Sequence, residues 1–183
     1  MDSALLASLN GVTVSDNGAV TQNVAALLNI YTADGSAYGN YSISDTAAAV
    51  AAANNTDAGL SNFATAVTLS TDATIAEAAN LEGITLKGGG GIAYNVTGTA
   101  TLLAAADAAD MSAAVNLIAS DDASVAEAVT ITAFTNSGTN TYGISDAIAG
   151  FIDANADNQA ANNAAVEAAT GTVTVTDNAT VAQ

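Results

Sequence analysis

The chain has 183 residues, of which 18 are acidic and only Lys87 is basic, so its formal net charge is −17. Nucleic acids and anionic membrane surfaces are excluded as partners, because binding to phosphates requires clustered cations. Cys and His are absent from the sequence, which excludes disulfides and thiolate metal sites and removes the commonest general base. No apolar run is long enough to cross a bilayer, so membrane insertion is not expected.

A motif of eleven residues occurs four times along the chain. It reads Val-Thr-Val-Ser-Asp-Asn-Gly-Ala-Val-Thr-Gln at residues 12–22, and variants of it occupy residues 67–77, 117–127 and 173–183. The copies follow one another at intervals of 50 to 56 residues, measured between four equivalent apolar positions: Val20, Ile75, Val125 and Val181. Self-similarity at a nearly constant period indicates a repeat architecture.

Each copy of this first motif predicts a strand followed by a helix. Residues 12–15 and 173–176 alternate apolar and polar side chains, which is typical of a strand with one covered face. Residues 74–77 and 124–127 fit a capping box, in which a hydroxyl and a carboxylate satisfy the free N–H groups at the start of a helix. We therefore expect helices to begin directly after Thr74 and Ser124.

A second motif, of the type Tyr-x-Ile-Ser-Asp-Thr-Ala, lies between copies of the first. It occupies residues 41–47, 94–100 and 142–148. The alanine-rich stretches that overlap or follow these copies favour helix. Asp45 and Asp146 are placed to cap helices that open at the residue after each of them. The helix bodies expected here are residues 47–53, 102–106 and 148–154.

Three tyrosines and two linking segments complete the local pattern. Tyr41, Tyr94 and Tyr142 share one position of the second motif and predict a structural stack rather than a ligand platform. Residues 84–86 and 131–134 have the character of short strands, so we expect a hairpin before each Tyr motif that follows them. Residues 88–91 are four glycines without a following Lys-Ser/Thr pair, which predicts a flexible loop rather than a phosphate-binding loop.

The predicted fold is an α/β solenoid of stacked strand-helix repeats, with a mainly parallel sheet covered by helices. Its period is a double repeat of about 53 residues. We expect one repeat domain over residues 1–183, with double repeats at about 12–66, 67–116 and 117–172 and a partial fourth at 173–183. Because the fourth copy ends as it enters its helix, we expect the chain to be a piece excised from a longer protein, the alternative being a subunit whose open end accepts another chain.

The acidic residues that follow the strands are the candidate sites. They could line one rim of the solenoid and bind calcium through oxygen ligands, or they could cap helices, where a carboxylate also interacts favourably with the helix N-terminus. Asp121 and Asp122 are the adjacent pair at such a turn and are the candidate metal ligands. No other cofactor is expected.

Two other functions have weaker support in the residues. A glycosidase would need two carboxylates a few ångströms apart, and nothing singles out such a pair among the 18 acids, so no enzymatic activity is expected. An ice-binding surface would need a flat array of threonines. The outward row that contains Thr13, Thr68 and Thr174 is interrupted by Ile118, and Thr is in any case a good strand residue.

The two motifs resemble repeats of very large secreted surface proteins of bacteria, including cyanobacteria. The resemblance extends from Val12 to Gln183 and implies an extracellular or cell-surface location and a structural or adhesive role, often in proteins exported by type I secretion. The resemblance does not include the calcium-binding repeat Gly-Gly-x-Gly-x-Asp, which is common in such secreted proteins. In this chain Gly91 is followed by Ile92, Ala93 and Tyr94, and no Asp is present there.

The expected function is therefore that of a non-enzymatic structural segment of a stalk, surface layer or adhesin. Its expected partners are neighbouring repeats of the parent chain or other copies bound end to end, and cell-surface glycans are a further option. The alternative is a calcium- or glycan-binding module, with ice binding as a third idea.

Overall fold

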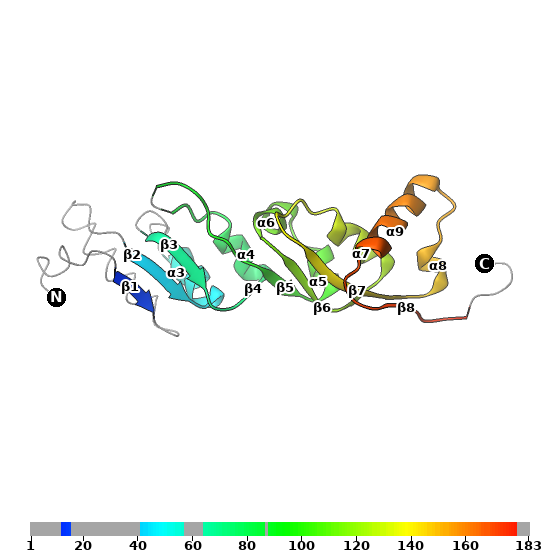
Figure 1. Cartoon of the computed structure of the whole chain (residues 1–183), viewed down its shortest axis with the longest axis horizontal. Coiled ribbons are helices and arrows are strands. Elements are labelled where there is room, and N and C mark those ends of the chain that lie inside the picture. The colour runs from blue at the N-terminus through cyan, green and yellow to red at the C-terminus, as the bar shows by residue number, and fades with distance from the viewer. Residues whose placement is uncertain (1–11, 16–40, 57–63, 87, 179–183) are drawn as a thin grey trace, which may run out of the picture. The chain divides into compact units, whose positions relative to one another are not determined.

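The computed structural model describes residues 12–15, 41–56, 64–86 and 88–178 (Figure 1). The chain divides into two compact units, Met1–Tyr94 and Asn95–Gln183. Each unit combines parallel strands with helices, so the predicted α/β class with parallel sheets is confirmed.

The first unit contains a parallel sheet with the strand order β1-β2-β3. These strands are Val12–Ser15, Tyr41–Asp45 and Ala64–Leu69, and in the sheet Ile43 of β2 lies between Val14 and Val67. Helix α3 (Ala47–Thr56) follows β2, while the two-residue strand β4 (Ala73–Thr74) leads into α4 (Ile75–Leu81), and α3 packs against α4.

The second unit repeats the same succession of parallel strands and helices. Its strands β5, β6, β7 and β8 are neighbours in that order in Figure 1 and span Val96–Gly98, Leu117–Ala123, Asn140–Asp146 and Val173–Val175. Its helices α5 to α9 span Ala100–Ala104, Ala108–Ala113, Val125–Thr132, Ile148–Phe151 and Ala156–Ala168. Helix α7 packs against both α5 and α9, so the helices succeed one another in the same order as the strands.

The sheet register shows that one strand-helix step is shorter than the double repeat. Within each unit, residues paired on neighbouring strands are 21 to 29 positions apart in the sequence, as in the pairs Val96–Leu117, Leu117–Asn140 and Ile144–Val173. Strand β6 begins at the first residue of a copy of the first motif, and β7 begins two residues before a copy of the second motif and ends within it. The two motifs therefore build the same kind of step, and two steps make one double repeat.

The predicted helix starts are confirmed at both capping boxes. The Thr74 backbone N–H donates to Glu77 Oε2 over 2.8 Å, and the Glu77 N–H donates to the Thr74 hydroxyl over 3.4 Å. Ser124 and Glu127 form the same reciprocal pair at the start of α7, with distances of 2.8 and 3.3 Å.

The predicted hairpins are wrong. Residues 84–86 form no strand, although Ile84 is buried, and residues 131 and 132 are the last turn of α7. The physical reason lies in the spacing of the apolar residues, because Val125, Ala128 and Ile131 recur every three positions and form the buried face of one helix. The capping box starts this helix early enough to include residues that have strand propensity of their own.

Two predicted helix bodies also differ from the structure. Helix α5 begins at Ala100, directly after its N-cap Thr99, and ends at Ala104. The predicted helix over residues 148–154 ends at Phe151, because the Asn155 side chain accepts bonds from the N–H groups of Asp157 and Asn158 and starts α9 instead.

The buried core of the second unit is small and lies between the sheet and the helices. Its largest fully buried side chains include Leu103, Met111, Leu117, Tyr142 and Ile144. None of the helices in the described ranges is both long and apolar enough to cross a bilayer.

Candidate functional site

Polar residues in the last part of two strands, Asp121 of β6 and Asp146 of β7, lie where one strand-helix step meets the next. Asp121 Oδ1 accepts a hydrogen bond of 2.7 Å from the N–H of Ala100, the first residue of α5. Asp146 Oδ2 accepts one of 3.0 Å from Val125, the first residue of α7. Each of these carboxylates therefore caps the helix of the preceding step, 21 residues earlier in the chain.

The same arrangement recurs at a third step and, with a neutral acceptor, in the first unit. Asp177 Oδ1 accepts a hydrogen bond of 2.6 Å from the N–H of Ile148, the first residue of α8. In the first unit, the Thr71 hydroxyl accepts one of 3.1 Å from Ala47, the first residue of α3. Thr71, Asp121 and Asp177 occupy one position of the first motif. This position holds a side-chain acceptor that joins consecutive steps.

The predicted caps at Asp45 and Asp146 differ from the structure in position and in partner. Helices α3 and α8 begin one residue later than predicted, at Ala47 and Ile148, so neither Asp is the N-cap residue. Asp146 Oδ1 accepts from the next N–H in the chain, that of Ala147, over 2.8 Å, while its Oδ2 reaches Val125. Asp146 thus binds its own step with one oxygen and the preceding step with the other.

Asp45 makes the contact within its own step that Asp146 also makes. Its Oδ1 accepts a hydrogen bond of 2.6 Å from the N–H of Thr46. Its side chain is almost completely buried, and its Oδ2 finds no hydrogen-bond partner among the described residues.

A second link joins the helices α5 and α7. The Thr101 hydroxyl on α5 donates to Glu127 Oε1 over 2.7 Å, while Glu127 Oε2 accepts the Ser124 N–H of the capping box. The hydrogen bond from Thr101, followed by that from the Ser124 backbone, lowers the pKa of Glu127 below its ordinary value. Glu127 therefore keeps its charge, and with it both hydrogen bonds, at a lower pH than an ordinary glutamate would.

Asparagine and tyrosine side chains supply further links between steps of the second unit. At the start of the strands, the Asn116 amide donates to Asn95 Oδ1 over 2.8 Å, and Asn116 Oδ1 accepts the N–H of Thr139 over the same distance. The buried Tyr142 hydroxyl donates to the carbonyl of Ala165 on α9 over 2.8 Å and lies 2.7 Å from the Thr132 hydroxyl at the end of α7.

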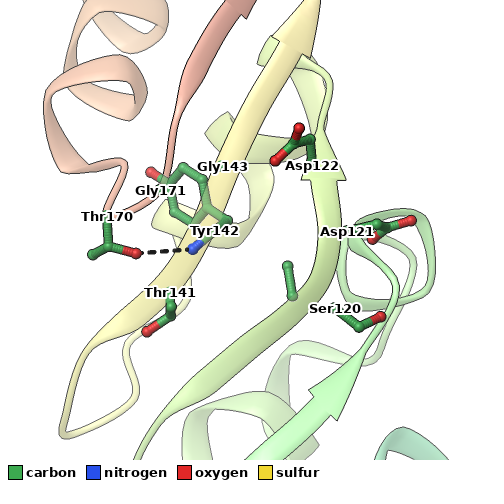
Figure 2. Close-up of a pocket in the computed structure, with 9 residues that line it drawn as sticks. Ser120, Asp121, Asp122, Thr141, Tyr142, Gly143, Thr170 and Gly171 are labelled. Carbon is green, nitrogen blue, oxygen red and sulfur yellow. Dashed lines mark hydrogen bonds between the residues drawn. The ribbon is translucent and has the colours of Figure 1, made fainter.

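The candidate calcium ligands Asp121 and Asp122 do not converge. Figure 2 shows their carboxylates on β6 pointing in different directions, and a register shift between Ile118 and Asp122 accompanies this divergence. Asp121 caps α5 through its hydrogen bond to the N–H of Ala100. Asp122 instead lies so close to Gly143 of β7 that a Cβ at that glycine would collide with the Asp122 carboxylate. Asp122 is exposed, and within the described part of the chain its carboxylate caps no helix.

Asp122 borders a shallow hollow of about 260 Å³ on the outer surface of the sheet. Its other lining residues include Asp121, Ser120, Thr141, Thr170, Gly143 and Gly171 (Figure 2). Within the described ranges, no group of three or more Asp, Glu, His or Cys side chains could hold a metal ion. A ligand in this hollow would lie beside Asp122 and near residues that carry hydroxyl groups.

The other predicted features are placed as follows. Tyr94 and Tyr142 are both buried, while the side chain of Tyr41 lies outside the described residues. Sheet register places Ile118 between Thr97 and Thr141, so the outward hydroxyl row is interrupted there. The glycines at positions 88 to 90 all have positive φ angles, and the N–H of Leu86 donates to the Gly90 carbonyl over 2.8 Å, which closes a turn.

Sequence reasoning missed the links between steps, namely the roles of Thr71 and Asp177 and the contact between Asn95 and Asn116. A signal for the first two was present. Aligning the copies of the first motif places a hydroxyl or a carboxylate in the same column each time, four residues after the start of the motif. A column that keeps its hydrogen-bond acceptors while charge varies favours a backbone contact over a metal ligand.

The neighbours Asp121 and Asp122 allow a matched test of this cap. Asp121→Ala should lower the free energy of unfolding by about 1 kcal/mol, because the first N–H of α5 loses its acceptor. Asp122→Ala removes the same charge one residue away and should change the free energy by less than about 0.5 kcal/mol. Urea unfolding followed by circular dichroism measures both. Equal effects of the two substitutions would contradict the proposed cap.

Comparison with known proteins supplies no family for this chain. No protein-family model matches it, and neither the comparison with curated proteins nor that with solved structures gives a match. What the chain does is therefore inferred from its own residues, of which the carboxylates between successive steps are the most regular.

Proposed function

We propose that the chain is a structural, non-enzymatic repeat segment of an extracellular bacterial surface protein, in a stalk, surface layer or adhesin. The observation that carries this proposal is the hydrogen bond from the first N–H of a helix to an acidic side chain of the next step, made at Asp121, Asp146 and Asp177. Side chains used in this way join units along an axis. They are not gathered around a reacting group.

In the proposed solenoid, each step supports the one before it and the one after it. The backbone ladders between parallel strands resist separation of neighbouring steps, and the caps and the Asn95–Asn116 contact add side-chain bonds at both ends of the strands. The net charge of −17 would keep neighbouring rods soluble and apart. Rigidity and solubility are what a stalk or a surface layer requires.

The composition and the placement of the acids favour a mechanical role over catalysis. General acid-base chemistry uses a titratable group aimed at a substrate, usually with a shifted pKa. Here Asp121 and Asp146 are engaged with backbone N–H groups, and Glu127 is held in its charged form by Thr101 and Ser124. These contacts support binding of one step to the next.

The solenoid can be tested by removing one double repeat in phase. Deletion of residues 96–143 joins Asn95 to Ile144, so that one Tyr motif continues directly into the next copy. In a stacked array the shortened chain should keep its helical signal and a cooperative urea transition, with a smaller m-value because less surface is buried. The control is deletion of residues 96–106, which removes β5 and α5 but not a whole step. If the larger deletion unfolds the chain as fully as the smaller one, the chain is a single globule and the solenoid is wrong.

Surface location needs a test of its own. On intact bacterial cells that produce the parent protein, an antibody against this chain should label the surface, and external protease should remove the label. Labelling that appears only after lysis would contradict an extracellular role.

A second candidate function, calcium or glycan binding, is favoured by the hollow beside Asp122, whose carboxylate is exposed and not used as a cap. If calcium binds there, millimolar calcium should raise the melting temperature, chelator should reverse the rise, and Asp122→Asn should abolish it. The Asp121→Asn variant is the control, because its amide oxygen can still accept the Ala100 N–H. An unchanged melting temperature in the unsubstituted chain excludes calcium binding, and a glycan array then tests the sugar form.

A further inference from the structure

Strand β8 presents an incomplete edge of the sheet in the second unit. It pairs with β7 on one side, and no strand in the described ranges pairs with its other side. Its apolar residues Val173 and Val175 are 43% and 48% exposed, whereas Ile144, the partner of Val173 on β7, is fully buried. The row that runs through Ala123 and Ile144 therefore becomes exposed at Val173.

The backbone of β8 is oriented to continue the ladder. The carbonyl of Thr172 accepts from the N–H of Ile144, and the N–H of Thr176 donates to the carbonyl of Asp146, both over 2.8 Å. In a parallel strand, alternate residues direct their backbone groups to opposite neighbours. Val173 and Val175 thus direct their N–H and C=O groups to the unpaired side, where a further strand would find donors and acceptors in register.

Strand β1 has the complementary edge and nearly the same sequence. Residues 12–15 read Val-Thr-Val-Ser and residues 173–176 read Val-Thr-Val-Thr. Among the described residues β1 pairs only with β2, which follows it in the chain, whereas β8 pairs with β7, which precedes it. In its own sheet, β1 is therefore free on the side where a preceding strand would lie, and in its own sheet β8 is free on the side where a following strand would lie.

We infer that the free edge of β8 binds β1 of a second copy of this chain in parallel, as the next step of the same sheet. This inference rests on the proposed solenoid. Because two different surfaces meet, the contact is heterologous, so copies add one after another and association does not stop at a symmetric dimer. A partner that binds by opposite charge is not expected at this edge, since the contact is made by the apolar row and by the backbone N–H and C=O groups of β8.

Charge gives the association a characteristic salt dependence. Each copy carries a net charge of −17, so end-to-end contact brings like charges together. Raising NaCl from about 0.02 M to about 0.5 M shortens the Debye length from roughly 20 Å to about 4 Å, which should weaken the repulsion and lower the apparent dissociation constant by about tenfold or more. A contact between opposite charges would weaken under the same change.

The experiment is sedimentation analysis of the whole chain over a concentration series at both salt concentrations. The mass should rise in steps of 17.7 kDa, with larger species at high salt. Val175→Pro removes a free-edge N–H without touching the bonds of Thr172 and Thr176 to β7, and should keep the chain monomeric. Val173→Lys should do the same although it reduces the net negative charge.

Ile152→Lys is the matched control, since Ile152 is 49% exposed but lies between α8 and α9, outside strand β8. It makes the same change in charge as Val173→Lys and should associate like the unsubstituted chain. Circular dichroism confirms that each variant is folded. The inference is overturned if the chain stays monomeric at both salt concentrations or if all the variants associate equally. Either outcome leaves the in-phase deletion result intact, because that deletion tests stacking within one chain.

Discussion

Much of this structure depends on one hydrogen bond, from the first N–H of a helix to a side-chain acceptor 21 to 29 residues later. The first turn of any helix has N–H groups without partners, and helices as short as α5 and α8 are marginal by themselves. Ala147, the N-cap of α8, provides no side-chain cap, so the N–H of Ile148 is satisfied by Asp177 of the next step. The helices α3, α5, α7 and α8 are thus completed by a side chain in the last part of the next strand or just beyond it.

This constraint accounts for the use of acidic residues in a chain that has almost no cations. A carboxylate at a helix start accepts strong hydrogen bonds and faces the positive end of the helix dipole, so it needs no Lys or Arg nearby. Asp146 joins two successive steps by itself, because one of its oxygens accepts the N–H of Ala147 and the other accepts the N–H of Val125. The apolar core can remain small, with Tyr142 and Ile144 among its largest side chains, since neighbouring steps share the stabilisation.

Local structure was predictable wherever the deciding contacts lie within a few residues. The capping boxes of Thr74 and Ser124 and the strand at Val12–Ser15 depend on adjacent residues, and all three are confirmed. The hairpin at residues 131–134 was predicted wrongly because β-branched residues favour a strand by themselves, whereas burial of Ile131 beside Val125 and Ala128 extends the helix. At these residues, packing of the helix against the core outweighs the local preference for a strand.

The sequence by itself determined the period, the alternation of strands and helices, and the position after each strand at which an acceptor recurs. Only the tertiary structure decided which helix each acceptor reaches, since a side chain can cap a helix 21 residues away only after the strands have paired in register. It likewise separated Asp121 from Asp122, because neighbouring side chains of a strand point to opposite sides and the register shift in β6 strengthens the divergence. One of the two therefore became a cap and the other an exposed carboxylate beside a hollow, a difference that depends on pairing between strands and not on residue type.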